Sequence, residues 1–400
     1  MIWNEFKKIW NIRILLLILV VGGIRFYFGP VGQMNLNYLP LWETVDVTVG
    51  AEIQRNYGNE LDASEIDEIR GLLAGAESDL ETKVAEQFPE MQRDYGFASY
   101  REFDEYYTGL NIEEFDIDSY REIETLYVDI LDTFAWEIAV CDYYNSLVFA
   151  ADNNAEAELQ RYQDYRGELF GNMYVDRMGE ILYSGIVTPL SATAVSNLGF
   201  VLQEYSSVIM MITLFLIFPY LAADNRSRIY PLIAASKEGR RIVRKQVIAV
   251  VCSVAVLMIV CDLLFFAVYR MRLPYQPFDH CRVLGLWFDM TFIQYFWAQV
   301  ILINIGAVAL AMIFFYISSH CRTLVGTVVS AIPCWLFGEF LSTCFYNKMF
   351  EMGFHDGRVI SYILNNMKYM TFVWEGLLVA AGITLLVILG HRRKVQDIYA

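Results

Sequence analysis

The sequence predicts a mainly α-helical, polytopic membrane protein with six transmembrane helices and a large, mostly helical extracellular domain between the first two. Hydrophobic residues make up 56% of the 400 positions and charged residues 19%, against about 45–50% and about 25% in average soluble domains. The apolar excess is confined to blocks near the N-terminus and between positions 200 and 390. Because a helix needs roughly 20 mostly apolar residues to cross a bilayer, these blocks predict membrane spans.

Charge divides the chain into two parts. Residues 33–200 carry 34 acidic and 9 basic side chains, a net charge of −25, whereas the remainder carries 12 and 21, a net charge of +9. Nucleic-acid binding requires a basic patch on a soluble face, so this distribution argues against nucleic acid as a partner. Of the seven cysteines only Cys141 lies in the acidic part, which excludes a disulfide framework there, and no pair has metal-site spacing.

The N-terminal region predicts an interfacial helix followed by the first span. Residues 1–13 place Trp3, Phe6, Ile9 and Trp10 at helical spacing, which is typical of an amphipathic helix lying in the headgroup layer. The first span is expected at residues 14–31. A cleaved signal peptide is the alternative for this segment, although no A-x-A-like cleavage site follows.

Residues 32–202 form the acidic extracellular domain, and most of its pattern is helical. Ser64 is expected to cap one helix, and Ser119-Tyr-Arg-Glu122 has the form of a capping box that opens another. Alternating apolar residues at 44–49 are a candidate strand. The many tyrosines of this domain are interpreted as amphipathic core and surface residues, with a peptide-binding surface as the alternative.

Residues 203–400 are expected to hold five further spans and a short basic C-terminal tail. The distribution of lysine and arginine sets their orientation. With the N-terminus inside, the short inside connections hold 14 basic residues and the short outside connections hold six. This predicts a multi-pass protein of the plasma membrane with both termini in the cytoplasm. The five spans are expected at roughly 203–223, 247–269, 293–317, 324–346 and 370–390.

The connection between the second and third spans, residues 224–246, reads DNRSRIYPLIAASKEGRRIVRKQ. Pro231 suits the first turn of a short helix over 231–236, and Gly239 can adopt the left-handed conformation that ends it. The pattern predicts a stiff lateral helix that can transmit force to a soluble partner. An ordinary cytoplasmic connection would also be basic, so charge alone does not distinguish the two interpretations.

This segment resembles the permease subunits of ABC exporters of the second type (ABC-2). Those carry an acidic residue after the second span, a proline–leucine pair, a small-residue/Lys/Gly/Arg-Arg turn and a further lysine. This chain has Asp224, Pro231-Leu232, Ser236-Lys237-Glu238-Gly239-Arg240-Arg241 and Lys245. The resemblance covers the membrane half, about 230 residues, and includes the six-span layout. The chain departs from many relatives in its large extracellular domain.

The resemblance implies that residues 229–238 are the coupling helix that seats on a separate ABC ATPase subunit. ATP and Mg would be bound by that partner, and this chain would hold no cofactor of its own. A second permease, identical or homologous, would complete the usual twelve-span pathway. The coupling residues implied by the resemblance are Asp224, Tyr230, Pro231, Leu232, Lys237, Glu238, Gly239, Arg240 and Arg241.

No catalytic motif is recognisable. The chain contains no G-x-x-x-x-G-K-[ST] phosphate loop, no H-E-x-x-H and no G-x-S-x-G. The protein is therefore expected to be a transport subunit rather than an enzyme. A polytopic membrane enzyme with an unrecognised site is a third alternative.

Three acidic residues fall inside predicted spans: Asp262, Glu339 and Glu375. Each lies about 15 residues, or about 22 Å, from the cytoplasmic end of its span, and Arg25 lies about 16 Å from its own. These four residues are the candidate translocation path: a carboxylate layer that lines an exit cavity for a cationic substrate, with Arg25 as an ion-pair partner. The alternative is that they are interfacial or internally paired. Asn304 and Gln294 are expected to hydrogen-bond between helices.

Taken together, the sequence favours the permease subunit of an ATP-driven ABC exporter that moves a peptide, lipid or drug-like substrate outward. The alternative is a non-transporting membrane sensor or immunity protein whose acidic outer domain binds a cationic peptide. A charge of −25 would speed association with such a ligand in a salt-dependent way.

Overall fold

The computed structural model describes residues 2–34, 40–110, 117–152, 155–156, 159–160, 172–226, 242–273, 276–321, 323–346, 350, 352 and 368–399. Over these ranges the chain is helical, with no β-strand and only two isolated bridges, Leu61 with Val187 and Arg282 with Thr291. The mainly α fold class is confirmed. The candidate strand at 44–49 was wrong, because these residues lie in a helix.

Five helical segments are long and apolar enough to cross a membrane. They indicate a polytopic helical membrane protein and correspond to five of the six predicted spans. The segments are the N-terminal run Trp3–Gln33 and helices α13 (Ala192–Arg226), α15 (Ile242–Arg272), α16 (Phe292–Ser318) and α19 (Met370–Tyr399).

The sixth predicted span corresponds to α17 (Leu324–Phe345), which is 22 residues long and contains Pro333. Its described apolar stretch, Val329–Cys344, is shorter than those of the other five. The sixth span therefore stays a prediction. Helix α17 packs against α13 and α16.

The N-terminal run is a series of short helical pieces. It comprises α1 (Ile2–Ile9), α2 (Ile12–Leu17), the π-helix η1 (Ile18–Gly22), α3 (Gly23–Phe28) and α4 (Pro30–Gln33). Asn11 separates the first two pieces, because its side chain caps α2 by accepting a hydrogen bond from the amide of Arg13. Helix α1 packs on α15 and α13, and its Glu5 accepts a hydrogen bond from Tyr220.

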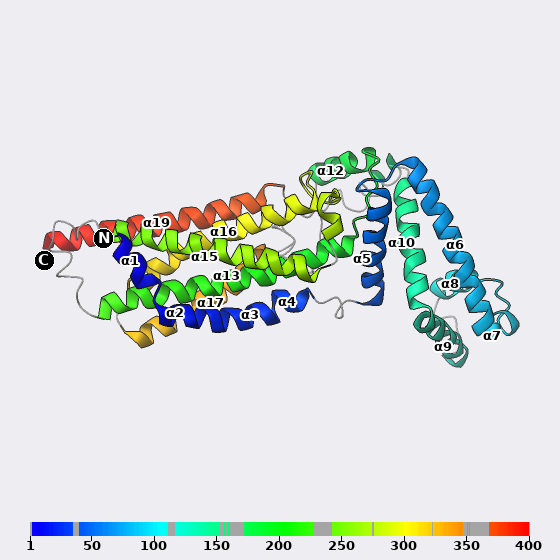
Figure 1. Cartoon of the computed structure of the whole chain (residues 1–400), viewed down its shortest axis with the longest axis horizontal. Coiled ribbons are helices and arrows are strands. Elements are labelled where there is room, and N and C mark those ends of the chain that lie inside the picture. The colour runs from blue at the N-terminus through cyan, green and yellow to red at the C-terminus, as the bar shows by residue number, and fades with distance from the viewer. Residues whose placement is uncertain are drawn as a thin grey trace.

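Helix α13 is the centre of the bundle and the most buried of the five candidate spans. It contacts α15, α16, α17 and the N-terminal run, and α16 in turn contacts α15 and α19. Figure 1 shows that both termini, the end of α13 and the start of α15 lie at one end of the bundle. We call this the termini end. The acidic domain lies at the opposite end, which we call the domain end.

The acidic domain is built on three helices that run across the long axis of the bundle (Figure 1). They are α5 (Leu41–Tyr57), α6 (Ala63–Gln87) and α10 (Ala135–Asp152), and they share one apolar core. Helix α12 (Asn172–Tyr183) lies at the junction with the bundle. A second core at the far tip involves α7 (Pro89–Arg93), α8 (Tyr100–Thr108) and α9 (Ile117–Thr133).

Helix α5 belongs to both the domain and the bundle. Val45, Val49 and Ile53 lie in the domain core, whereas Val47 and Ala51 lie in the bundle core. Residues four apart share one face of a helix, and residues two apart point in well-separated directions. A helix that is buried on two sides therefore shows the alternating pattern of a strand, which explains the incorrect strand prediction.

Two predicted helix starts need correction. Helix α6 is capped by Asp62 rather than Ser64, because the Asp62 carboxylate accepts from the amide of Glu65 while the Glu65 carboxylate accepts from the amide of Asp62. Ser119 lies inside α9, which begins at Ile117. The helical segment that follows is divided at Phe134 into α9 and α10.

The close approach of α5 to α10 allows a stability test. A Cβ atom at Gly50 would lie 2.7 Å from the Tyr143 hydroxyl and 2.8 Å from the Pro189 carbonyl oxygen. We expect Gly50→Ala to lower the free energy of unfolding by about 1–3 kcal/mol through overpacking. The exposed Gly75 of α6 has no atom within 4 Å of such a Cβ, so Gly75→Ala should raise it by about 0.5–1 kcal/mol. Thermal unfolding of the full chain in detergent measures both; equal effects would contradict the tight α5–α10 contact.

Candidate functional site

The three acidic residues predicted inside the spans lie in three separate groups of described polar side chains. In the first, Asp262 of α15 accepts hydrogen bonds from the Tyr205 hydroxyl at 2.5 Å and from the Asn304 amide at 2.7 Å. Tyr205 lies on α13 and Asn304 on α16, so one carboxylate joins three helices. Hydrogen bonding of this kind satisfies a polar group where water is absent.

The second group joins α3, α13 and α17. The guanidinium of Arg25 forms an ion pair with Glu204 at 2.7 Å and donates to the Ser207 hydroxyl at 3.2 Å. Ser207 donates to Glu339 at 2.6 Å, and the same carboxylate oxygen accepts from the Trp335 indole at 3.0 Å. These contacts form one continuous polar chain from Glu204 to Trp335, which we call the α13–α17 network.

The third group is centred on Glu375 of α19, whose residue is only 7% exposed. Its carboxylate accepts a hydrogen bond from the Tyr346 hydroxyl at 2.6 Å. Gly306 of α16 makes this contact possible, because a Cβ atom there would lie 1.7 Å from that hydroxyl. The other carboxylate oxygen has no hydrogen-bond partner among the described residues.

The three predicted intramembrane acids therefore have separate partners and do not contact one another. Arg25 pairs with Glu204, which the sequence did not single out. Helix α13 begins at Ala192, ahead of the predicted start at 203, and this places Glu204 about 18 Å along the helix.

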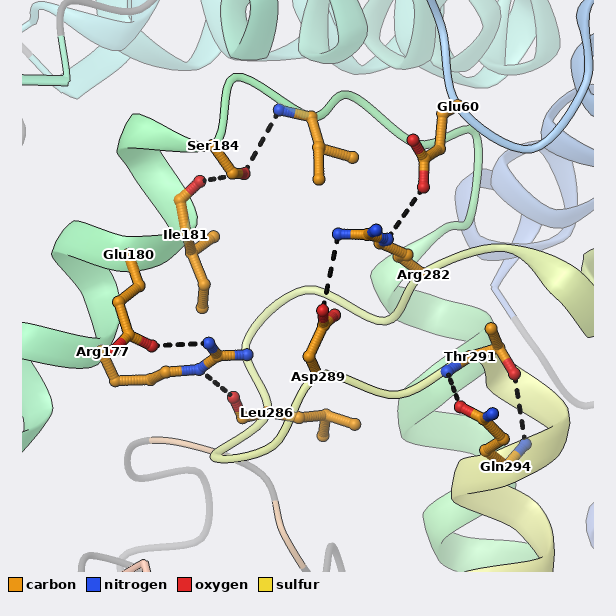
Figure 2. A network of polar contacts seen from close by, with 11 residues as sticks. Glu60, Arg177, Glu180, Ile181, Ser184, Arg282, Leu286, Asp289, Thr291 and Gln294 are labelled. Atoms are coloured by element: carbon orange, nitrogen blue, oxygen red, sulfur yellow. Dashed lines mark hydrogen bonds and ion pairs between the residues drawn. The ribbon is translucent and has the colours of Figure 1, made fainter.

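The predicted Gln294 contact between helices was wrong. Gln294 belongs to the capping box of its own helix: its side-chain oxygen accepts from the amide of Thr291, and its amide donates to the Thr291 hydroxyl (Figure 2).

The α13–α17 network lies on a partly open face of the bundle. The side chains of Arg25 and Glu204 are 34% and 23% exposed, and Trp335 is 42% exposed. Ionisable groups within membrane spans nearly always face protein or water rather than lipid. This face is therefore expected to be covered by protein or to border a water-filled path.

The predicted coupling residues lie almost entirely outside the described part of the chain. Asp224 lies in the last turns of α13. The remaining predicted coupling residues fall in the segment 227–241, which the structure does not describe.

A cleft of about 860 Å³ lies at the junction of the acidic domain and the domain end of the bundle. We call it the junction cleft. Helices α5 and α10 form one side, and α12, the start of α13 and the loop before α16 contribute the others. Its apolar walls include Trp42, Leu147, Met178, Leu190 and Met352, and its polar lining includes Asp46, Asp142, Ser146, Ser191 and Ser196.

Ion pairs and hydrogen bonds hold these walls together (Figure 2). Arg282 bridges Glu60 of the acidic domain, at 2.8 Å, and Asp289 of the loop before α16, at 3.5 Å. Arg177 of α12 pairs with Glu180 at 2.7 Å and donates to the Leu286 carbonyl at 3.0 Å. The loop is thereby tied to both α12 and the turn between α5 and α6.

Two carboxylates of the junction cleft have perturbed titration. Burial raises the pKa of Asp46 above its usual value, although hydrogen bonds from Thr193, at 3.1 Å, and Ser191 act in the opposite direction. Asp142 keeps part of its surface open to solvent. Desolvation by burial of the remainder raises its pKa, and the negative charges of Asp104 and Asp46 raise it further. Within the described ranges Asp142 has no ion-pair partner.

A second cleft, of about 520 Å³, adjoins α10 within the acidic domain. We call it the acidic cleft. Glu77, Glu81, Asp104 and Glu105 line it together with Arg101, which pairs with Glu105 at 3.3 Å. Asp142 lines both clefts. In the part of the chain that the structure describes, no group of three histidine, cysteine or acidic residues could hold a metal ion.

Comparisons of the chain with protein-family models, with curated proteins and with solved structures found no match. The features of the chain that bear on its function are the sequence motif, the polar groups of the bundle and the two clefts.

The ion pair of the α13–α17 network predicts a strong stability effect. Arg25→Met leaves the Glu204 carboxylate without its cation, and we expect the free energy of unfolding to fall by about 1–3 kcal/mol. Arg25→Met combined with Glu204→Gln removes both charges and should recover most of the loss. Unfolding of the full chain in detergent, analysed as a double-mutant cycle, measures this coupling. Additive losses would contradict the ion pair.

The raised pKa of Asp142 predicts a pH-dependent stability change. A carboxyl group with a higher pKa in the folded state binds protons more tightly there, so its contribution to stability falls as pH rises. Asp142→Asn should therefore raise the melting temperature at pH 7, and the gain should shrink as pH is lowered and the wild-type group is protonated. Asp129→Asn, at an exposed position on α9, is the matched control. A lower melting temperature for Asp142→Asn at pH 7 would refute this expectation.

Proposed function

We propose that this chain is the membrane-spanning permease subunit of an ATP-driven ABC exporter. It would move a peptide, lipid or drug-like substrate outward when coupled to a separate ATPase. We base this on the sequence of residues 224–246, with its Pro231-Leu232 pair and its Lys237-Glu238-Gly239-Arg240-Arg241 turn. In this proposal the termini end lies in the cytoplasm and the acidic domain lies outside the cell.

The arrangement of the described helices supports this assignment. The proposed coupling segment joins α13 to α15, and the end of α13 and the start of α15 lie at the termini end of the bundle (Figure 1). An ATPase bound there would be separated from the acidic domain by the length of the bundle. Movement of the coupling segment would act directly on α13, the helix that contacts most of the other spans.

The partly open α13–α17 network supports pairing with a second permease. Arg25 and Glu204 need protein or water around them, and six spans would supply half of a twelve-span pathway. We place the second permease against the face formed by α3, α13 and α17. ATP binding to the two ATPases would draw the coupling segments together, tilt the spans and open the path between the permeases outward.

A second candidate function is a non-transporting sensor or immunity protein. The junction cleft and the acidic cleft favour it, because both lie in or against the acidic domain and neither requires an ATPase. The two candidates differ in one observable respect: only the exporter binds an ATPase at the termini end.

The coupling assignment predicts that an ATPase co-purifies with the chain from mild detergent. Gly239→Pro would stiffen the turn, and Arg240→Glu/Arg241→Glu would reverse two charges beside it, so either change should reduce the recovered ATPase by about tenfold or more. Arg93→Glu/Arg121→Glu, at exposed sites in the acidic domain, is the matched charge reversal and should leave recovery unchanged. Undiminished recovery with both coupling variants would show that this segment does not bind the ATPase.

A further inference from the structure

The junction cleft and the acidic cleft adjoin the same helix and share Asp142. The residues of α10 that line one or the other cleft extend from Ile138 to Ala150. Twelve helical steps correspond to about 18 Å. Ile138, Cys141 and Asn145 line the acidic cleft, whereas Ala139, Tyr143 and Ser146 line the junction cleft, so the two clefts lie on adjacent faces of α10 and meet at Asp142. We call the two adjoining clefts together the α10 groove.

Both clefts of the α10 groove are lined by negatively charged side chains. Asp104, Asp142 and Asp46 are close enough that the charges of the outer two raise the pKa of Asp142. The lining of the junction cleft contains no lysine, arginine or histidine among the described residues. The acidic cleft has one, Arg101, whose charge is already balanced by Glu105. The groove therefore attracts positive charge and concentrates it between low-dielectric walls.

The spacing of these carboxylates favours separated positive charges over a metal ion. A divalent ion needs several oxygen ligands around one point, and the described acidic side chains form no such group. A ligand with charges spread along its length can instead meet the carboxylates one after another. The stretch of α10 that the two clefts line, about 18 Å, equals the length of about five residues of extended peptide.

The junction cleft adds apolar surface beside the charge. Trp42, Leu147, Met178 and Leu190 supply it, and the cleft volume lies in the range of sites that bury most of a small ligand. Trp42 is 57% exposed, so its ring is available for contact. A purely polar cation would leave these walls without a partner.

We propose that the α10 groove binds an extended segment of a cationic amphipathic peptide. Its apolar side chains would occupy the junction cleft, and its basic side chains would lie against Asp46, Asp142 and Asp104. The peptide would then contact the start of α13 through Ser191 and Ser196. This site is independent of the coupling segment and needs no ATPase.

Binding is tested on the full chain in nanodiscs of zwitterionic lipid. The probe is a fluorescent peptide of leucine and lysine, and its affinity is measured by fluorescence anisotropy after subtraction of binding to empty nanodiscs. We expect Asp46→Asn/Asp142→Asn to weaken binding by about tenfold and added salt to weaken wild-type binding. Asp129→Asn/Asp132→Asn removes the same charge from an exposed face of α9 and should leave affinity within about twofold, because exposed charges away from a site contribute little.

Two further probes test the apolar and charged parts separately. A peptide with glutamine in place of lysine should bind much more weakly, and Trp42→Ser should weaken the lysine peptide without lowering the melting temperature. Equal affinity of the wild type and the Asp46/Asp142 variant would overturn the proposal. Equal binding of the lysine and glutamine peptides would overturn it as well, as would spermidine displacing the lysine peptide as effectively as unlabelled peptide. None of these results depends on whether an ATPase co-purifies.

Discussion

The absence of water along the spans is the constraint on which this structure depends. A backbone in hydrocarbon has to satisfy its own hydrogen bonds, which makes helices the only open-ended solution. The same constraint acts on the side chains. Asp262 is hydrogen-bonded by residues of two neighbouring helices, and Arg25 is neutralised by Glu204. These contacts also fix which helices lie together, because each joins residues far apart in the sequence.

The acidic domain is joined to this bundle through a helix that both parts share. Val45 and Val49 of α5 pack into the domain, whereas Val47 packs into the bundle. Arg282 adds a polar connection by bridging Glu60 and Asp289. The walls of the junction cleft come from both sides of this connection. A displacement of α13 or of the loop before α16 relative to α5 would therefore change the shape of the cleft.

Hydropathy predicted the fold class and five of the spans well, because a stretch long enough to cross a bilayer is unambiguous. The predictions that were wrong, and the residues that were overlooked, have local causes. The valines of α5 alternate because the helix is buried on two sides, which no single-face pattern describes. Asp62 could not be separated from Ser64 as a cap, since both precede the same acidic turn. Glu204 lay too near a predicted boundary to be counted as an intramembrane charge.

The candidate site was less predictable than the fold. Asp262, Glu339 and Glu375 were found because acids within apolar stretches stand out, but their partners Tyr205, Ser207 and Tyr346 are ordinary residues in sequence. The junction cleft left no sequence signal at all. It is assembled from α5, α10, α12 and the loop before α16, and only the packing of these elements brings Asp46 near Asp142.

The proposed function requires that the acidic domain and the 224–246 segment lie on opposite sides of a plasma membrane. Single cysteines introduced into a cysteine-free chain, as Asp129→Cys in the acidic domain and Lys237→Cys in the segment, test it directly with a membrane-impermeant thiol reagent. We expect position 129 to be labelled in intact cells and position 237 to be labelled only after the cells are permeabilised. Labelling of position 237 in intact cells would contradict the proposed topology and, with it, the coupling to a cytoplasmic ATPase.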